Sequence, residues 1–481
     1  MAQTEQPKEI DAADLPLSVS GDADTSRYLQ LAHQLQALID SGTLRAGSRL
    51  PPSRELALAL GVNRNTVVSA FERLKSFGLI ETRGRGGSVV CNLMRQTAPP
   101  ASRPRLRGRS PGAPRPAHPI DFRMGSADPS PLPLEVWRRA CREAGRHLPG
   151  GDYGDPRGDA ALRGEIALYL GRTRSMRVDP DHVMITAGSG RAIERIAEVC
   201  LRRRDTAVVE EPGYPSAASI FQRLGARLIP VPVDEEGLDT DYLQAANRPI
   251  RLIHVTPSHQ YPLGGRLSSA RRNFLIQWAR QNGALIIEND YDGEFRYGAA
   301  PLPALGSLAG FDHIAYVGTF SKVLSPAIRL GFVVTRPDLI AAMAKLVAES
   351  RDSVSIVTQR IIAWLIGSGE LEKHVRRVRR SYAQRRAAML QALSEIPQIQ
   401  SVTGQAAGLH VVVGLRAGLR LMRLAGQWER HGIVVDRVAD FQLGRQSDDR
   451  VLMAYGHLTE PVIVEGIRRF GAAIRVLAPD S

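Results

Sequence analysis

The 481-residue chain has few cysteines, few aromatic residues and no long apolar run. Its three cysteines, Cys91, Cys141 and Cys200, lie far apart and match no metal-ligand spacing, so we expect buried, reduced thiols and no metal site. No apolar stretch approaches the roughly 20 residues that a membrane-spanning helix needs, and the N-terminus lacks the basic start of a signal peptide. The composition therefore predicts a cytoplasmic globular protein of two or three domains, with no membrane partner.

Acidic residues are scarce in one part of the chain. Residues 27–118 hold 15 lysines and arginines against four acids, whereas residues 1–26 hold six acids and one lysine. The acidic tail at 1–26 is short of aromatic residues, and we expect it to be disordered. A dense basic segment beside a nearly balanced body predicts that only the front of the chain contacts a polyanion.

The basic segment begins with a helical pattern. Apolar residues recur at helical spacing from residue 29 to residue 39, and Ser53 is expected to be the N-cap of a short helix over 54–60. A second helix over 64–77 follows a tight turn, and two short strands flank the Arg83–Gly86 segment. This order predicts a winged helix-turn-helix at 27–91, whose second helix enters the DNA major groove.

The candidate DNA contacts lie on that second helix, on the helix before it and in the wing. Arg64, Asn65 and Thr66 begin the second helix and are placed to reach base edges or phosphates, while Arg54 and Arg85 suit phosphates or the minor groove. A winged helix that binds another protein is the alternative. Residues 92–119 contain six arginines, no acids and many prolines, which predicts a semi-extended basic linker that could also touch DNA.

Residues 120–481 alternate between β-rich and helical segments. Short apolar runs occur at 183–186, 206–209, 252–255, 284–287, 314–317 and 331–334. This alternation predicts an α/β domain with a mainly parallel sheet. Long basic helices are expected over 339–349, 353–366 and 371–393, followed by a small α+β part with strands at 410–413 and 451–455.

One lysine has neighbours that suit a phosphorylated aldehyde cofactor. Lys322 lies between Thr319-Phe320-Ser321 and Arg329, seven residues later. An amine can form a Schiff base, while hydroxyls and a guanidinium hold a phosphate. For an isolated Ser-Lys pair, a lysine in a polar loop would be the ordinary interpretation.

Other candidate cofactor contacts follow strands upstream, where open parallel sheets bind their ligands. Ser189 and Gly190 begin a helix and offer backbone amides to a phosphate. Tyr214 could stack on a flat heterocycle, or could simply be a buried tyrosine. Two more strand ends supply Tyr261, and Asn289, Asp290 and Tyr291.

These motifs together resemble a known family. Residues 27–91 resemble the GntR-type winged helix in the pattern Leu50-Pro51-x-Ser53-Arg54-x-Leu56-Ala57 and then Leu60-Gly61-Val62-x-Arg64-x-Thr66-Val67. Residues 120–478 resemble a fold-type I, class I aminotransferase. The combination is similar to the MocR branch of GntR regulators.

The resemblance implies that Lys322 forms a Schiff base with pyridoxal 5′-phosphate (PLP). It also implies that Ser189, Thr319 and Arg329 bind the phosphate and that Tyr214 stacks on the ring. Tyr291 would lie near the phenolic oxygen. The other implied cofactor neighbours are Gly190, Tyr261, Asn289, Asp290 and Ser321. A head-to-tail homodimer is implied too, with Tyr153 reaching a phosphate across the dimer interface.

Two positions depart from the family pattern. Relatives usually have an aspartate at position 289 to pair with the pyridine nitrogen, and Asn289 cannot supply that charge, although Asp290 could replace it after a register shift. Aminotransferases place a carboxylate-binding arginine where the alignment puts Leu452, and Arg450 is a conceivable substitute.

The main hypothesis is therefore a DNA-binding transcriptional regulator that senses PLP, an amine or an amino acid and has little transaminase turnover. An active PLP-dependent aminotransferase with an appended DNA-binding module is the alternative. A PLP-carrying scaffold that does not bind DNA is a third hypothesis.

Overall fold

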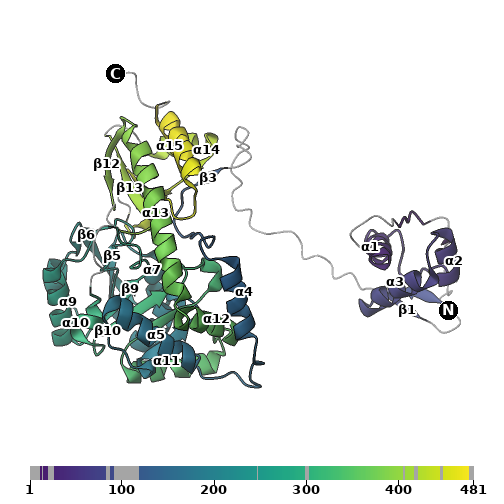
Figure 1. Ribbon diagram of the computed structural model, residues 1–481, viewed down its shortest axis with the longest axis horizontal. Coiled ribbons are helices and arrows are strands. Elements are labelled where there is room, and N and C mark those ends of the chain that lie inside the picture. Colours follow the sequence, from purple (N-terminus) through teal and green to yellow (C-terminus); the bar gives the residue numbers. More distant parts are fainter. Residues whose placement is uncertain are drawn as a thin grey trace. The chain divides into compact units, whose positions relative to one another are not determined.

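The computed structural model describes residues 11–12, 15–19, 26–82, 87–91, 119–245, 248–297, 303–404, 407–416, 421–444 and 448–475. The chain divides into two compact units, Met1–Ser110 and Pro111–Ser481 (Figure 1). No helix in the described ranges is both long and apolar enough to cross a membrane.

The described residues of the first unit form three α-helices and a pair of antiparallel strands. Helix α3 packs against both of the other helices, and the strands pair Ile80 with Val90 in antiparallel register. The elements are α1 (Arg27–Asp40), α2 (Ser53–Ala59), α3 (Arg64–Ser76), β1 (Ile80–Thr82) and β2 (Ser88–Val90). The apolar faces that the sequence pattern indicates meet in one core, which includes Leu35, Leu56 and Val67.

The start of α2 differs from the expectation. Pro52, not Ser53, is the N-cap residue of this helix, with extended backbone angles and no side-chain capping bond. Proline favours extended angles here, and the hydroxyl of Ser53 instead accepts a hydrogen bond from Arg64 Nε at 3.5 Å. At α3 the expected turn does supply a cap, because the Asn63 side chain accepts from the backbone N–H of Asn65.

Part of the acidic N-terminal segment packs on this unit. Leu15 is only 9% exposed, and Leu17 and Val19 contact the same core. The backbone of Ser18 exchanges two hydrogen bonds with the Gln34 side chain, at 2.9 and 2.6 Å. The expectation of disorder throughout 1–26 is therefore wrong for residues 15–19, because their alternating apolar residues add to the core.

The second unit contains an eight-stranded sheet in the order β4-β11-β10-β9-β8-β5-β6-β7. The ladders that join β5, β6, β8, β9 and β10 are parallel, whereas β11 and β7 run antiparallel to their neighbours. The bounds are β4 (Val183–Thr186), β5 (Thr206–Glu211), β6 (Arg227–Asp234), β7 (Gly237–Leu238), β8 (Ile250–Val255), β9 (Leu285–Asp290), β10 (Ile314–Thr319) and β11 (Gly331–Val334). The sheet is thus mainly parallel, as the sequence predicts.

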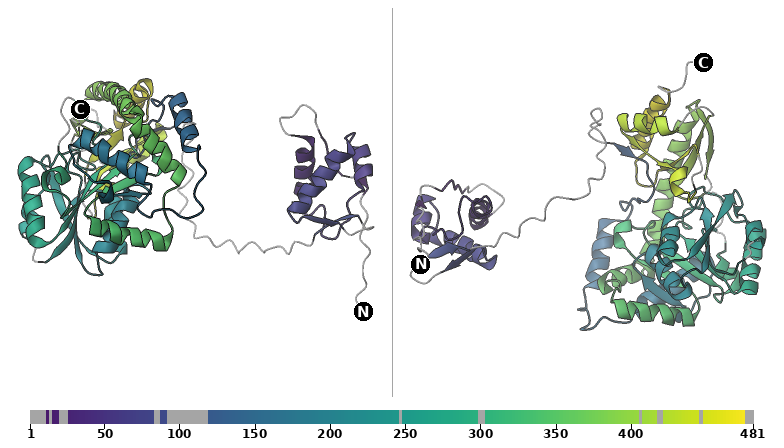
Figure 2. Two further views of the ribbon diagram at one scale, coloured as in Figure 1. Left: turned by 60° about the horizontal axis from the view of Figure 1, so that its bottom comes forward. Right: turned by 180° about the vertical axis from the view of Figure 1, so that it is seen from behind.

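Helices surround this sheet (Figure 2). They are α4 (Leu134–Ala144), α5 (Ala160–Arg174), α6 (Ser189–Cys200), α7 (Pro215–Arg223), α8 (Asp241–Gln244), α9 (Ser269–Asn282), α10 (Leu305–Ala309), α11 (Pro337–Ser350) and α12 (Ile356–Gly367), with short 3₁₀ turns η3 (Pro180–His182) and η4 (Pro326–Ile328). Strands β5, β8, β9 and β10 are buried along nearly their whole length, because helices cover both faces, whereas β6, beside the edge strand β7, is mostly exposed or half-buried.

A smaller α+β part follows the long helix α13 (Glu370–Ser394). Its antiparallel sheet has the order β12-β13-β16-β15, and a separate pair joins β14 to β3 in parallel. The bounds are β3 (Ile120–Asp121), β12 (Ile399–Thr403), β13 (His410–Leu415), α14 (Leu421–Arg430), β14 (Ile433–Val434), β15 (Asp436–Arg437), η5 (Val438–Phe441), β16 (Arg450–Ala454) and α15 (Glu460–Arg475). In Figure 1, α13 runs from the large part to the small one.

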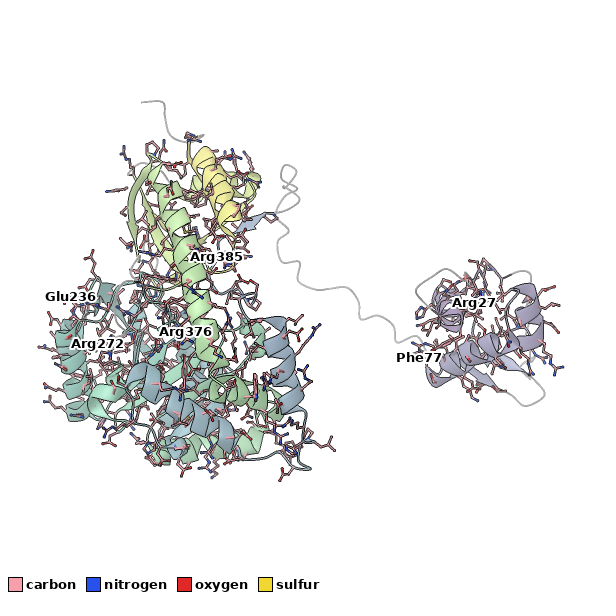
Figure 3. The ribbon with its side chains drawn as sticks, in the orientation of Figure 1. Arg27, Phe77, Glu236, Arg272, Arg376 and Arg385 are labelled. Atoms are coloured by element: carbon pink, nitrogen blue, oxygen red, sulfur yellow. The ribbon has the colours of Figure 1, made fainter. Side chains whose placement is uncertain are left out.

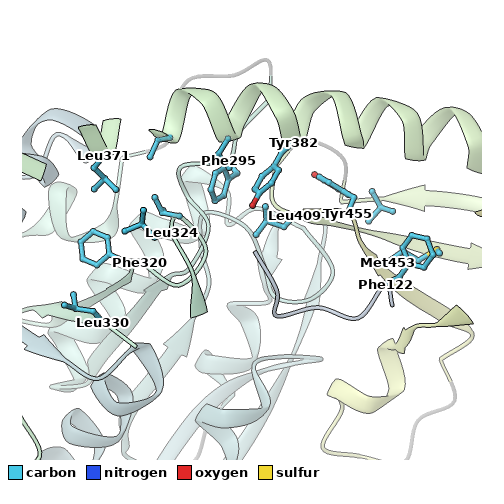
Figure 4. Close-up of a cluster of buried hydrophobic side chains, with 14 of the residues drawn as sticks. Phe122, Phe295, Phe320, Leu324, Leu330, Leu371, Tyr382, Leu409, Met453 and Tyr455 are labelled. Atoms are coloured by element: carbon cyan, nitrogen blue, oxygen red, sulfur yellow. The ribbon is translucent and has the colours of Figure 1, made fainter. Parts of the chain in front are cut away.

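One buried cluster joins the large and small parts beneath α13 (Figure 4). Tyr382 of α13 packs on Phe295, with ring centroids 5.2 Å apart, and its hydroxyl accepts from the backbone N–H of Asp128. The hydroxyl of Tyr455 donates to the carbonyl of Gly408 at 2.8 Å. The two parts therefore share a core, and their buried polar tips are satisfied.

Two buried arginines hold loops in place (Figure 3). Arg385 of α13 donates to the Gly456 carbonyl and to the Asp128 carboxylate, both at 2.6 Å. Arg272 of α9 donates to three backbone carbonyls, those of Pro257, Leu267 and Pro303. Through Pro257 and Leu267, Arg272 fixes both ends of a loop that carries Tyr261.

The three cysteines are free and half-buried. The prediction of buried thiols is therefore confirmed only in part, with Cys141 and Cys200 packed against buried clusters of the second unit. Burial nevertheless raises the pKa of Cys200 to about 11, so its thiol stays protonated at neutral pH.

Candidate functional sites

A cavity of about 760 Å³ lies in the second unit, beside the ends of β4, β9 and β10. Ten of the twelve cofactor-binding residues that the sequence indicates line it, namely Ser189, Gly190, Tyr214, Tyr261, Asn289, Tyr291, Thr319, Ser321, Lys322 and Arg329. They come from segments up to 140 residues apart in sequence. The sequence gives only the order of these motifs, and the fold brings them to one cavity.

Lys322 is half-buried in this cavity. Its Nζ donates a hydrogen bond to the backbone carbonyl of Gly125 at 2.7 Å. Burial lowers the pKa of Lys322, which favours the neutral amine. A neutral amine is the form that attacks an aldehyde to give a Schiff base.

One end of the cavity suits a phosphate. Gly188, with φ of 91°, turns the chain into α6, so the first N–H groups of that helix, at Ser189 and Gly190, have no partner within the helix. Two hydroxyls line the same cavity, with Thr319 Oγ1 3.0 Å from Ser321 Oγ. Arg329 adds a guanidinium on an exposed side chain. Helix amides, hydroxyls and a guanidinium together make an anion cradle.

Tyrosines form the walls of the cavity. Tyr214 and Tyr261 meet edge to face with centroids 5.5 Å apart, and Tyr261 meets Tyr291 in the same way at 5.3 Å. The hydroxyl of Tyr291 lies 2.9 Å from His259 Nδ1, and burial raises the pKa of Tyr291. Neutral aromatic walls of this kind suit a flat heterocycle.

Asn289 lies on the cavity face of β9 and is 3% exposed. Its Nδ2 lies 3.4 Å from His254 Nε2, and burial lowers the pKa of His254 to about 4, so the neutral ring can accept this hydrogen bond. Asn289 Oδ1 is buried and has no hydrogen-bond partner among the described residues. An unpaired acceptor in the cavity wall fits a ring N–H donor.

Asp290 faces away from the cavity, because side chains alternate along β9. Its Oδ2 accepts hydrogen bonds from Arg174 Nε and from the Tyr316 hydroxyl, both at 2.7 Å. Burial would raise the pKa of Asp290, but the Arg174 guanidinium holds it below its usual range. The prediction that Asp290 could contact the cofactor is therefore corrected: this carboxylate belongs to a buried ion pair, and Asn289 faces the cavity.

Some cavity residues were missed in the sequence. Asp352 lines the rim and accepts from Arg191 and Arg195, while Gly125 accepts from Lys322. Arg191 and Asp352 are 161 residues apart, so no local pattern connects them. Only the packing of α6 against the segment after α11 could reveal this contact.

Tyr153 does not line the cavity of its own chain. Its side chain is 67% exposed, and the Arg351 guanidinium lies 4.8 Å from the ring centroid. Arg351 Nη1 also donates to the Tyr153 hydroxyl at 3.1 Å. A role of Tyr153 across a dimer interface stays a prediction.

The position of the missing carboxylate clamp is apolar. Leu452 is fully buried and packs with Val412 and Val438. Arg450, two residues earlier, forms an ion pair with Asp448 at 2.6 Å and lines a different cavity. Arg450 therefore does not substitute for a clamp at the cofactor cavity.

The candidate DNA contacts lie on the surface of the first unit. Arg54, Arg64 and Asn65 are exposed, and Thr66 is half-buried. They gather where α2 and α3 begin, since Arg64 reaches Ser53 of α2. Arg85 lies outside the described residues. A basic surface at the start of a recognition helix suits phosphates and base edges.

Known proteins resemble the chain over nearly its whole length. Residues 27–90 match the family of bacterial regulatory proteins called gntR, and residues 119–468 match aminotransferase class I and II. The HTH-type pyridoxine biosynthesis transcriptional regulator PdxR of Corynebacterium glutamicum is 33% identical over 94% of this chain and 96% of its own. The probable rhizopine catabolism regulatory protein MocR of Rhizobium meliloti is 34% identical over 77% of each chain.

Among solved structures, LysN of Thermus thermophilus resembles the second unit. This α-aminoadipate aminotransferase, complexed with N-(5′-phosphopyridoxyl)-L-leucine, has a TM-score of 0.68 and 29% identity. The match covers 75% of this chain and 92% of that one. The fold of residues 119–468 is thus that of fold-type I aminotransferases.

Proposed function

Because the chain belongs to the MocR-type branch of the GntR regulators, we propose that its cofactor cavity reports a small molecule to its DNA-binding unit. The protein is a transcriptional regulator with an aminotransferase-like domain that binds pyridoxal 5′-phosphate. The observation that supports this proposal is one cavity lined by both Lys322 and Asn289. Lys322 suits attachment of the cofactor, whereas Asn289 does not suit catalysis. We place the protein in the cytoplasm, where its DNA target would be.

The residues of the cavity fit the cofactor. Lys322 would attach it, the start of α6 with Thr319 and Arg329 would hold its phosphate, and Tyr214 would cover its ring. The buried, unpaired Asn289 Oδ1 would accept from a protonated ring nitrogen. When bound, PLP supplies an aldehyde and an electron-withdrawing ring.

Asn289 argues against efficient transamination. A carboxylate at this position would stabilise the charged pyridine nitrogen, whereas an amide accepts a hydrogen bond without a negative charge. Leu452 offers no group that could orient a substrate carboxylate. We therefore propose little or no multiple turnover with common α-amino acids.

The molecule sensed is then the free cofactor or an amine without an α-carboxylate. The relative from C. glutamicum is named as a regulator of pyridoxine biosynthesis, which supports testing free PLP first. DNA affinity should be measured by fluorescence anisotropy, on fragments that the purified protein retains from its own genome, with and without PLP and amines. Unchanged affinity with PLP and with every amine would overturn the sensing proposal.

An active aminotransferase is the second candidate function, and the likeness to LysN favours it. Single-turnover absorbance with a panel of amino acids separates the two. We expect little conversion of bound PLP to pyridoxamine phosphate, and more in Asn289→Asp. Turnover by the unmodified protein at about 1 per second or faster, within the usual enzyme range, would favour the enzyme.

We also propose a homodimer in which Tyr153 reaches the partner's cofactor phosphate. The exposure of Tyr153 supports this, because its ring is free of its own chain's cavity. Sedimentation equilibrium tests the dimer. Tyr153→Phe should weaken PLP binding without changing the dimer if the hydroxyl makes that contact.

A further inference from the structure

A second cavity, of about 720 Å³, lies where the large and small parts of the second unit meet. Its walls come from the turn between β6 and β7, from residues 258–266, from the end of β12 and from Arg450 of β16. Figure 1 shows β6 and β12 on facing sides of this junction. None of the described residues that line it also lines the cofactor cavity, and its volume is typical of small-molecule sites.

The charges on its walls are unevenly compensated. Arg450 is paired with Asp448, and Asp234 is held by Arg271, each at 2.6 Å. Glu235 is an exposed residue of the rim. Arg266 and Arg296 remain, and neither forms an ion pair with a described residue.

Arg296 is unusual because it is buried without a carboxylate partner. It is 7% exposed, its Nη1 reaches the Ser258 carbonyl only at 3.4 Å, and its Nε has no partner among the described residues. Burial lowers the pKa of Arg296, and the nearby charge of Arg266 lowers it further, although Asp292 opposes this. Two guanidinium groups that repel each other in a cavity create a site where an anion would be stabilised.

His259 completes the polar wall. It is 3% exposed, and its Nδ1 lies 2.7 Å from Asp292 Oδ2, which leaves Nε2 buried without a partner among the described residues. Gly408, with φ of 84°, packs against the ring so closely that a Cβ there would overlap His259 Cε1. The ring is therefore fixed, and Nε2 is the atom that could hydrogen-bond a ligand in this cavity.

We propose that this second cavity binds a small anion with two or more acceptor oxygens, a carboxylate or a phosphate. Arg296 and His259 form its buried end, and Arg266 closes it from the surface side. Such a ligand would bridge the large sheet and the small α+β part. The two cavities share no lining residue, although His259 of this site contacts Tyr291 in the wall of the cofactor cavity.

Isothermal titration of the full-length protein, saturated with PLP, tests this site. Sodium phosphate and sodium succinate are titrated separately at constant ionic strength, so that the two arms distinguish phosphate from carboxylate. Saturation with PLP keeps phosphate out of the cofactor cradle. We expect one of the two anions to bind at millimolar concentration or tighter.

Arg266→Gln and Arg296→Gln should each weaken that binding at least about tenfold, because each removes a charge-assisted contact. The matched control is Arg468→Gln, which removes the same charge from an exposed ion pair on α15 and should leave binding unchanged. Arg266 is exposed, so its variant should fold even if Arg296→Gln does not. No binding of either anion, or full binding in the Arg266 variant, would overturn the proposal.

Discussion

The two units of the chain use arginine in opposite ways. In the first unit, Arg54 and Arg64 are exposed at the start of helices, where they can meet an outside polyanion. In the second unit, Arg174 is buried between Asp290 and Glu294, with ion-pair distances of 2.7 and 3.1 Å. An exposed guanidinium contributes to binding and little to folding, whereas a buried one is part of the folded structure.

The same contrast applies to lysine and asparagine. Lys322 and Asn289 act at the wall of a cavity, and their properties depend on what surrounds them. Asn65 is exposed, and its contacts would come from DNA. The candidate DNA contacts of the first unit can therefore be predicted from residue type and position in the sequence. The properties of the cavity residues in the second unit depend on how the chain packs around them.

The largest effect is expected at the cavity. Lys322→Ala should abolish the borohydride-reducible PLP adduct, because no other amine lines this cavity among the described residues. Intact-protein mass spectrometry after borohydride reduction measures the yield of this adduct. Lys345→Ala, an exposed lysine of α11, is the control and should keep the adduct. An adduct at full yield in Lys322→Ala would contradict the assignment.

The buried ion pair should give the next largest effect. Arg174→Met leaves Asp290 and Glu294 buried without a cation, so the free energy of unfolding should fall by about 3–5 kcal/mol. All four tryptophans, Trp137, Trp278, Trp364 and Trp428, lie in the second unit, so their fluorescence during urea unfolding reports on this unit alone.

The control for that experiment is Arg468→Met in the same unit. It breaks an exposed pair with Glu465, and we expect the free energy of unfolding to change far less than in Arg174→Met. Similar losses in both variants would remove the contrast between buried and exposed arginines.

A smaller effect is expected on DNA binding. Arg64→Ala should weaken DNA binding by roughly 1–3 kcal/mol if the Arg64 side chain contacts a base. Arg54→Ala should make the DNA affinity less dependent on salt if Arg54 contacts a phosphate. Fluorescence anisotropy over a salt series measures both. Lys75→Ala, near the other end of α3, is the control and should bind nearly normally. If both arginine variants kept the affinity of the unmodified protein, the DNA-binding surface would lie elsewhere.

The smallest effect concerns pH. Burial raises the pKa of Glu210 to about 7, so its carboxyl group is protonated in the folded protein at pH 6. Its stabilising contribution is present below the unfolded pKa and is lost as pH rises through 7. One such group changes stability by at most about 1.4 kcal/mol per pH unit.

Glu210→Gln mimics the uncharged form, because its amide carries no negative charge and its oxygen can still accept a hydrogen bond from Thr256. Stability should therefore fall less between pH 6 and pH 8 in this variant, as followed by tryptophan fluorescence in urea. Some dependence of stability on pH should remain, because burial raises the pKa of Glu288 in the same way. An equally steep slope in Glu210→Gln would show that Glu210 does not ionise in this range.

Several elements could be predicted from the sequence because their signals are local. The helix predicted over 64–77 is α3, Arg64–Ser76, and the one predicted over 371–393 is α13, Glu370–Ser394. Apolar periodicity and flanking turn residues determine such elements. Strand β6, Arg227–Asp234, was not predicted, because Pro230 and Pro232 interrupt the pattern.

The sequence alone determined the order of two units, the parallel character of the sheet and the motifs around Lys322. These depend on residue type and spacing, which neighbouring positions in the chain specify. Tertiary structure decided that Asn289 faces the cavity, because Arg174, 116 residues before Asp290, pairs with that carboxylate on the other face of β9. Tertiary structure also places Arg450 in the wall of a second cavity, and it gives Arg296 no carboxylate partner among the described residues. Burial and charge pairing depend on residues distant in sequence, so only the folded chain brings them into contact.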